Sequence, residues 1–154
     1  AHQEIKKLAL LYPDGNLSFE QVKDAVLNVA RYDVFKLSDA MVTANVVRYN
    51  RILDGLQGEG SPPPLILATL AEQIRQLIII RKGLDSGMAP AQLMKEARLW
   101  GDRQKTMTTA AKRIDLKSLM QGLLHAAKID RVIKGVAKGD IWEELLQLGL
   151  RFRK

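Results

Sequence analysis

Apolar residues recur every three to four positions along almost the whole chain, which is the spacing of amphipathic helices. Residues 116–124 show the pattern clearly, because their leucines and methionine repeat at helical intervals. No segment alternates apolar and polar residues over enough positions to make a convincing strand. The pattern therefore predicts an all-α fold, built as a helical bundle.

Turn and capping residues divide the first third of the chain. Residues 13–16 read Pro-Asp-Gly-Asn, a strong turn signal that ends the first predicted helix. Ser18 and Gln21 then form a capping box for a helix that runs to about Ala30. Asp33 can cap the next helix, so we expect three separate helices in this region.

Glycines and prolines mark the later helices. Gly58 and Gly60 end one helix, and the prolines at 62–64 open a long one that runs to about Lys82. Its apolar positions are spread around most of the helix circumference, so we expect a central core helix. Its apolar run is interrupted and falls short of the ~20 residues of a membrane span, so no membrane partner is expected. Further helices are predicted to begin at Pro90, Asp102, Asp115 and Asp140.

The composition narrows the possible partners and chemistry. The 154 residues carry a net charge of +7, which favours an acidic partner such as nucleic acid or an acidic protein face. Cysteine is absent, which excludes a disulfide framework, a thiol nucleophile and a thiolate metal site and fits a reducing cytoplasm. The chain begins at Ala1 inside an amphipathic pattern, so we expect a piece of a longer protein.

No set of side chains suggests catalysis. His2 and His125 are the only histidines, and neither lies near a convincing carboxylate cluster in the sequence. No glycine-rich phosphate loop is present. We therefore expect a non-catalytic chain without catalytic residues, a metal site or a cofactor. Asp130 continues an apolar stripe and is predicted to pair with Lys134, four residues later.

Several segments together resemble one family. Residues 33–41 (DVFKLSDAM) and 59–67 (EGSPPPLIL) are similar to the C-terminal part of the delta subunit of the bacterial DNA polymerase III clamp loader. Residues 3–12, 17–30, 130–135 and 142–145 are also similar to the family, and all the matches occur in the family's order. The resemblance implies a subunit of a DNA polymerase holoenzyme, although the chain itself is expected to be non-catalytic.

The resemblance also implies an organisation and a set of partners. Residues 1–31 would be the C-terminal end of an AAA+ lid domain, and residues 32–154 a helical collar domain. The collar would assemble the clamp-loader pentamer by contacting the gamma or tau and delta-prime subunits, in the bacterial cytoplasm at the nucleoid-associated replisome. Neighbouring subunits would bind ATP. The sliding clamp would be contacted only through the family's N-terminal domain, which is not among these residues.

A contact with primer-template DNA at Trp100 is a further implication of the resemblance. A tryptophan at a helix junction is often a core or hinge anchor, whereas one beside cations is typical of single-stranded nucleic-acid binding. Some family members carry an aromatic residue just before the final helix, where residues 135–139 offer none. The candidate DNA-binding residues are Trp100, Arg98, Arg103, Lys105, Lys112, Arg113, Lys134 and Lys138.

Two other interpretations stay open. The lid and collar of a gamma or delta-prime subunit would show a similar helical pattern, although residues 35–40 favour delta. An unrelated basic helical DNA-binding module would also explain the charge, although no helix-turn-helix or zinc finger is evident.

Overall fold

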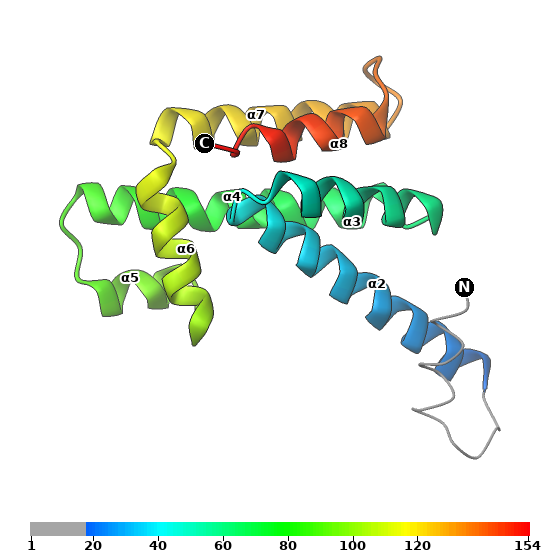
Figure 1. Cartoon of the computed structure of the whole chain (residues 1–154), viewed down its shortest axis with the longest axis horizontal. Coiled ribbons are helices and arrows are strands. Elements are labelled where there is room, and N and C mark those ends of the chain that lie inside the picture. The colour runs from blue at the N-terminus through cyan, green and yellow to red at the C-terminus, as the bar shows by residue number, and fades with distance from the viewer. Residues whose placement is uncertain (1–17) are drawn as a thin grey trace.

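The computed structural model describes the backbone of residues 18–154 and the side chains of residues 18–26 and 31–154. Figure 1 shows these residues as a helical bundle, and no strand occurs among them, so the predicted all-α fold is confirmed. The first predicted helix lies outside the described residues. The helices are α2 (Phe19–Val42), α3 (Val46–Gly58), α4 (Pro63–Asp85), α5 (Pro90–Glu96), α6 (Asp102–Arg113), α7 (Leu116–Ile133) and α8 (Ile141–Leu150).

α2 is one continuous helix where the sequence predicted two. The Ser18 side chain accepts a hydrogen bond from the Gln21 backbone, and the Gln21 side chain accepts one from the Ser18 backbone, so the capping box is confirmed. The predicted break before Asp33 is wrong, because no glycine or proline interrupts residues 19–42. The predicted boundary between lid and collar, between residues 31 and 32, falls inside α2 and stays a prediction.

α4 is the central helix, as predicted. Pro63 and Pro64 lie in its first turn, where a missing N–H leaves no hydrogen bond unmade. The helix contacts α2, α5, α6, α7 and α8, and its Leu70, Ile74 and Leu77 are fully buried. α4 is the one described helix that is long and apolar enough to cross a membrane. Half of its most apolar window is buried inside the bundle, which is the pattern of a core helix.

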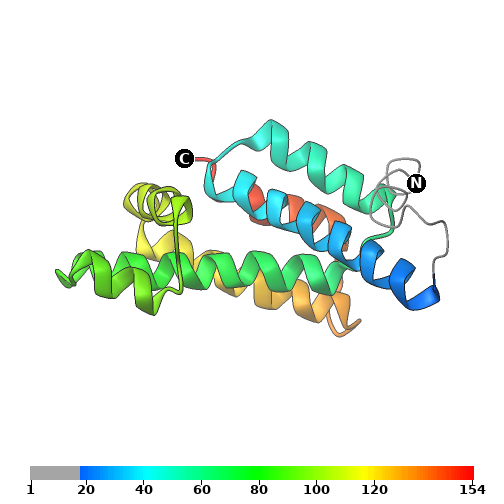
Figure 2. The ribbon, with the colours of Figure 1, turned by 90° about the horizontal axis from the view of Figure 1, so that it is seen from below.

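The other long helices form layers around α4. Figure 2 shows α4 and α7 side by side, α3 on the opposite side of the molecule, and α2 and α8 between them. α7 and α8 run antiparallel, and Asp115 and Asp140 cap them as predicted. Each of these carboxylates accepts a hydrogen bond from a backbone N–H three residues later.

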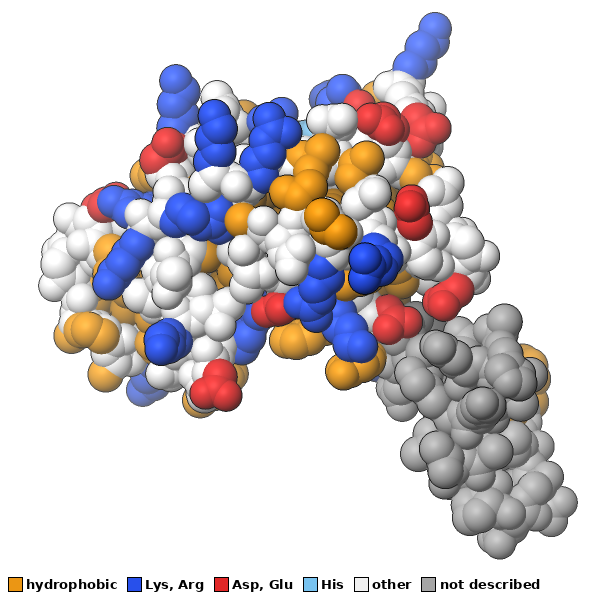
Figure 3. Space-filling view, viewed as in Figure 1, with side chains coloured by type: hydrophobic (Ala, Val, Ile, Leu, Met, Phe, Trp, Pro, Cys, Tyr) orange, Lys and Arg blue, Asp and Glu red, His pale blue; other side chains and the backbone are white. Residues whose placement is uncertain are grey.

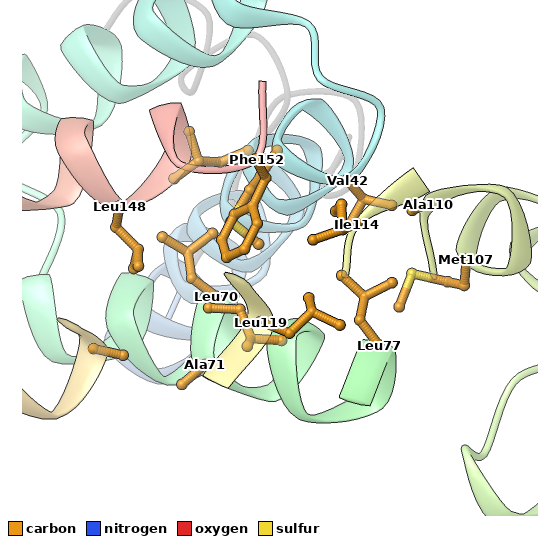
Figure 4. Close-up of a cluster of buried hydrophobic side chains, with 14 of the residues drawn as sticks. Val42, Leu70, Ala71, Leu77, Met107, Ala110, Ile114, Leu119, Leu148 and Phe152 are labelled. Atoms are coloured by element: carbon orange, nitrogen blue, oxygen red, sulfur yellow. The ribbon is translucent and has the colours of Figure 1, made fainter. Parts of the chain in front are cut away.

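One core joins the layers. Figure 4 shows the Phe152 ring, which follows α8, among Leu70 of α4, Leu119 of α7 and Ile114. Phe152 is almost completely buried. A Cβ on Gly122 of α7 would overlap the Phe152 ring, so the glycine is what lets the ring lie directly against the helix backbone.

Candidate functional site

The corner between α5 and α6 displays Trp100 on the surface, with 74% of the residue exposed. The adjacent Leu99 is buried and anchors the corner in the core. Arg98 and Gly101, on either side of this pair, both adopt positive φ angles (57° and 63°), which turn the chain sharply. Trp100 is therefore not a core anchor, because Leu99 fills that role.

Hydrogen bonds hold this corner in place. The Leu99 N–H donates to the Met94 carbonyl at 3.0 Å, and the Gln104 side chain donates to the Leu99 carbonyl at 2.9 Å. Beside Trp100 lies a hollow of about 330 Å³ that Pro90, Met94 and Gln104 help to line. The indole is thus presented from a fixed backbone beside a hollow of mixed polar and apolar lining.

Arg103 binds other parts of the protein. Its guanidinium donates to Asp39 of α2 at 3.0 Å and to the Gln73 side chain of α4. It also lies over the Phe35 ring, with its Cζ atom 4.9 Å from the ring centroid. Burial lowers the pKa of Arg103, and the nearby Asp39 carboxylate opposes that shift. Arg103 therefore ties α6 to α2 and α4.

Arg113 also binds within the protein. Its guanidinium donates to the carbonyl oxygens of Phe152 (2.7 Å), Lys154 (2.8 Å) and Val42 (2.8 Å). Burial lowers the pKa of Arg113. These contacts fasten the end of the chain to the ends of α2 and α6.

The remaining predicted cations fall into two groups. Arg98, Lys105 and Lys112 are exposed on α6 and the corner before it. Lys134 and Lys138 lie beyond the far end of α7, an 18-residue helix of about 27 Å. The eight candidates therefore do not form one continuous surface. Lys134 also pairs with Asp130 at 2.7 Å, so the predicted i,i+4 pair is confirmed.

A charged cluster between α7 and α8 was not predicted. The His125 Nε2 atom lies 2.5 Å from a Glu144 oxygen, and Arg151 Nε donates to His125 Nδ1 at 2.8 Å. Lys128 binds the other Glu144 oxygen at 3.2 Å. Because Arg151 donates to Nδ1, the proton of the neutral ring lies on Nε2, where it is donated to Glu144. The hydrogen bond from His125 is the main cause that lowers the pKa of Glu144.

This cluster links residues 19 positions apart, so no local sequence signal could have identified it. Only the antiparallel packing of α7 and α8 brings the side chains together. Among the described residues, no group of three or more histidine, aspartate or glutamate side chains could hold a metal ion.

The outward face of α7 is apolar at its centre, and cations precede and follow this centre along the helix. Leu124 is 70% exposed and Met120, one turn earlier, is 43% exposed. Lys117, Lys128 and Arg131 lie at helical spacing around them and are also exposed. In Figure 3, Lys and Arg side chains project along the upper edge, where α7 lies, and hydrophobic side chains are visible beside them.

A groove of about 610 Å³ runs between α4 and α7. Its apolar lining includes Leu67, Ala68 and Ala71 of α4 and Leu123 and Ala127 of α7. Alanines leave room for the side chains of another helix to enter. Because Leu123 and Ala127 lie on α7, the groove adjoins the outward face of that helix.

Comparisons with known proteins agree on one family. The family described as "DNA polymerase III delta subunit, C-terminal domain" matches residues 31–148. The DNA polymerase III subunit delta of Escherichia coli strain K12 is 30% identical over 149 residues, which cover 96% of this chain and 43% of that protein. Its Haemophilus influenzae counterpart is 27% identical over 97% of this chain and 46% of that protein.

A solved structure shows the same fold. The Bacillus subtilis DNA clamp loader delta protein aligns with a TM-score of 0.63 and 21% identity, over 99% of this chain and 45% of that chain. The chain thus spans less than half the length of these relatives. The family match covers most of the chain and favours delta over both alternative interpretations. The chain belongs to the DNA polymerase III delta subunit family and corresponds to the C-terminal part of its members.

Proposed function

We propose that this chain is the collar through which a delta subunit joins the clamp-loader pentamer, with gamma or tau and delta-prime subunits as its partners. The observation that carries the proposal is the outward face of α7, where Leu124 and Met120 are exposed between lysines and an arginine. Exposed apolar side chains that gather on one helix face are typical of interfaces. Lys117 and Arg131 favour an acidic partner helix, whereas Lys128 already binds Glu144.

The groove beside this face supports the same proposal. Its alanine-lined floor suits a packed helix, which is a common form of protein recognition. In the proposed assembly, ATP is bound by neighbouring subunits and the sliding clamp by the N-terminal domain of delta. The proposed setting is the bacterial cytoplasm, at the replisome.

Co-purification tests the proposal. The chain is mixed with separately purified gamma and delta-prime subunits and examined by size-exclusion chromatography with light scattering. We expect a discrete complex that Leu124→Glu weakens at least tenfold, because a charge would enter the apolar centre of the interface. Val47→Glu is the matched control, since Val47 of α3 is 69% exposed but lies off α7. A folded wild-type chain that forms no complex would contradict the proposal.

A contact with primer-template DNA is the second proposed function, favoured by the fixed display of Trp100. Exposed cations at this corner and along α6, which follows it, include Arg98, Lys105 and Lys112. Arg103 and Arg113 support the fold, so they are weaker candidates for phosphate contacts.

Trp100→Ala and Trp100→Phe separate the indole's stacking from its packing. In a reconstituted loader, we expect Trp100→Ala to weaken DNA-dependent activity and Trp100→Phe to retain most of it, because an aromatic face is kept. The alanine variant should stay folded, since the side chain is exposed. DNA binding should also weaken steeply with added salt. Unchanged activity in Trp100→Ala would remove this residue from the DNA contact.

A further inference from the structure

Two aromatic rings lie exposed on the outer face of α2, away from the core. Tyr32 is 55% exposed and Phe35 is 46% exposed. Val34, Leu37 and Met41 are buried on the opposite side of the same helix, so the two rings are not part of the hydrophobic core. Tyr32 and Phe35 are three residues apart, which places them next to each other on one helix face.

A cationic side chain lies over each ring. Lys36 Nζ lies 4.4 Å from the centroid of the Tyr32 ring, and Arg103 Cζ lies 4.9 Å from that of Phe35. Cations gather at these rings because the aromatic face is electron-rich. The face of α2 therefore alternates rings and positive charges, with one cation supplied by α2 itself and one by α6.

The charge of this face is only partly neutralised. Asp39 accepts hydrogen bonds from Arg103 at 3.0 Å and from Arg48 of α3 at 2.9 Å. One carboxylate thus serves two guanidinium groups, while Lys36 lies over a ring. The contacts to Asp39 also hold Arg103 in position over Phe35, so the arrangement is fixed by three helices.

We infer that Tyr32, Phe35, Lys36 and Arg103 form a binding strip for single-stranded nucleic acid. Unpaired bases would stack on the exposed rings and on the guanidinium of Arg103. Lys36, whose Nζ lies over the Tyr32 ring, would move from the ring to a backbone phosphate. A duplex would bind this strip less well, because its base faces are already stacked.

The strip is a different site from the corner at Trp100, and it rests on the proposed DNA contact only for the choice of ligand. A protein partner is the main competing occupant. The arrangement favours nucleic acid, because two rings and a guanidinium offer stacking surfaces and Lys36 offers a phosphate partner beside them. An interface with another subunit is treated as an outcome of the test.

Fluorescence anisotropy with a labelled short oligothymidine tests the inference on the full 154-residue chain at low salt. We expect Tyr32→Ala to weaken binding about tenfold, and Tyr32→Phe to bind like the wild type because the ring is kept. Phe19→Ala is the matched control, since Phe19 begins the same helix and is 79% exposed. A duplex competitor should displace the oligonucleotide less well than an unlabelled single strand.

Each result separates this strip from the Trp100 contact. If Trp100→Ala weakens binding and Tyr32→Ala does not, the strip is refuted and the proposed DNA function stands. If Tyr32→Ala alone weakens binding, the strip stands and the Trp100 contact fails. A wild-type chain that does not bind the oligonucleotide would overturn the strip. So would a Tyr32→Ala variant that loses loader subunits but keeps DNA, because the face would then be a protein interface.

Discussion

Gly149 of α8 lets α3 pack closely against α8, which makes it a sensitive test of the packing. A Cβ at this position would overlap the Tyr49 ring of α3, with even the third-nearest ring atom only 2.6 Å away. The ring cannot easily move, because it is almost fully buried and its hydroxyl donates to the Leu145 carbonyl at 2.6 Å. Burial also raises the pKa of Tyr49, so the hydroxyl stays protonated as a donor.

We expect Gly149→Ala to destabilise the protein by about 2 kcal/mol. Overpacking a tight core costs up to about 3 kcal/mol, and alanine returns about 1 kcal/mol because it favours helix over glycine. Gly55 of α3 is the control, since a Cβ there meets no atom within 4 Å. Gly55→Ala should therefore stabilise the protein by about 0.5–1 kcal/mol.

Urea denaturation followed by far-UV circular dichroism measures both variants. In a thermal melt followed by the same signal, a loss of 2 kcal/mol should lower the melting temperature by roughly 6 °C in a chain of this size. Adding Gly149→Ala to a Tyr49→Leu background should cost much less, because the ring that causes the overlap is gone. Equal stability of Gly149→Ala and Gly55→Ala would refute the proposed packing of α3 against α8.

Two further predictions concern charged contacts. Arg113→Ala should cost about 1 kcal/mol in urea denaturation, because three carbonyl oxygens lose a charged donor at a site that water can partly reach. Arg113→Lys should recover only part of this loss, and an unchanged midpoint would mean that the end of the chain is not fastened there. Glu144→Gln should destabilise the protein at neutral pH, because the folded carboxyl has a lowered pKa and its contacts stabilise the fold above the ordinary value of 4.5. The difference from the wild type should shrink as the pH falls through the lowered folded pKa, and a difference independent of pH would exclude the ionised Glu144 carboxylate as its source.

The helices were largely predictable from sequence because their signals are local. Ser18, Asp115 and Asp140 each cap a helix through a backbone N–H three residues later, a spacing that the sequence shows directly. The break before Asp33 was wrong for the same reason. Aspartate is a good cap but also fits inside a helix, and only tertiary packing decides between the two roles.

The candidate site was less predictable, because its contacts join distant parts of the chain. The sequence identified Arg103 as basic but could not show that Asp39, 64 positions away, binds it. Leu124 fitted the apolar pattern of its helix, yet it lies on the solvent side of α7. Periodicity locates an apolar stripe, but its edges are assigned to core or surface by the neighbouring helices.

The contacts of Arg103 decide which substitutions can diagnose DNA binding. Its guanidinium binds α2 and α4, covers Phe35 and lies on the helix that follows Trp100. Removing it would uncover a further part of the half-exposed Phe35 ring, leave Asp39 with one guanidinium partner and loosen α6 at the same time. A loss of DNA binding in Arg103→Ala would therefore not distinguish a phosphate contact from a displaced corner. Tyr32 and Trp100 are cleaner probes, because both are exposed and neither contributes to the buried core.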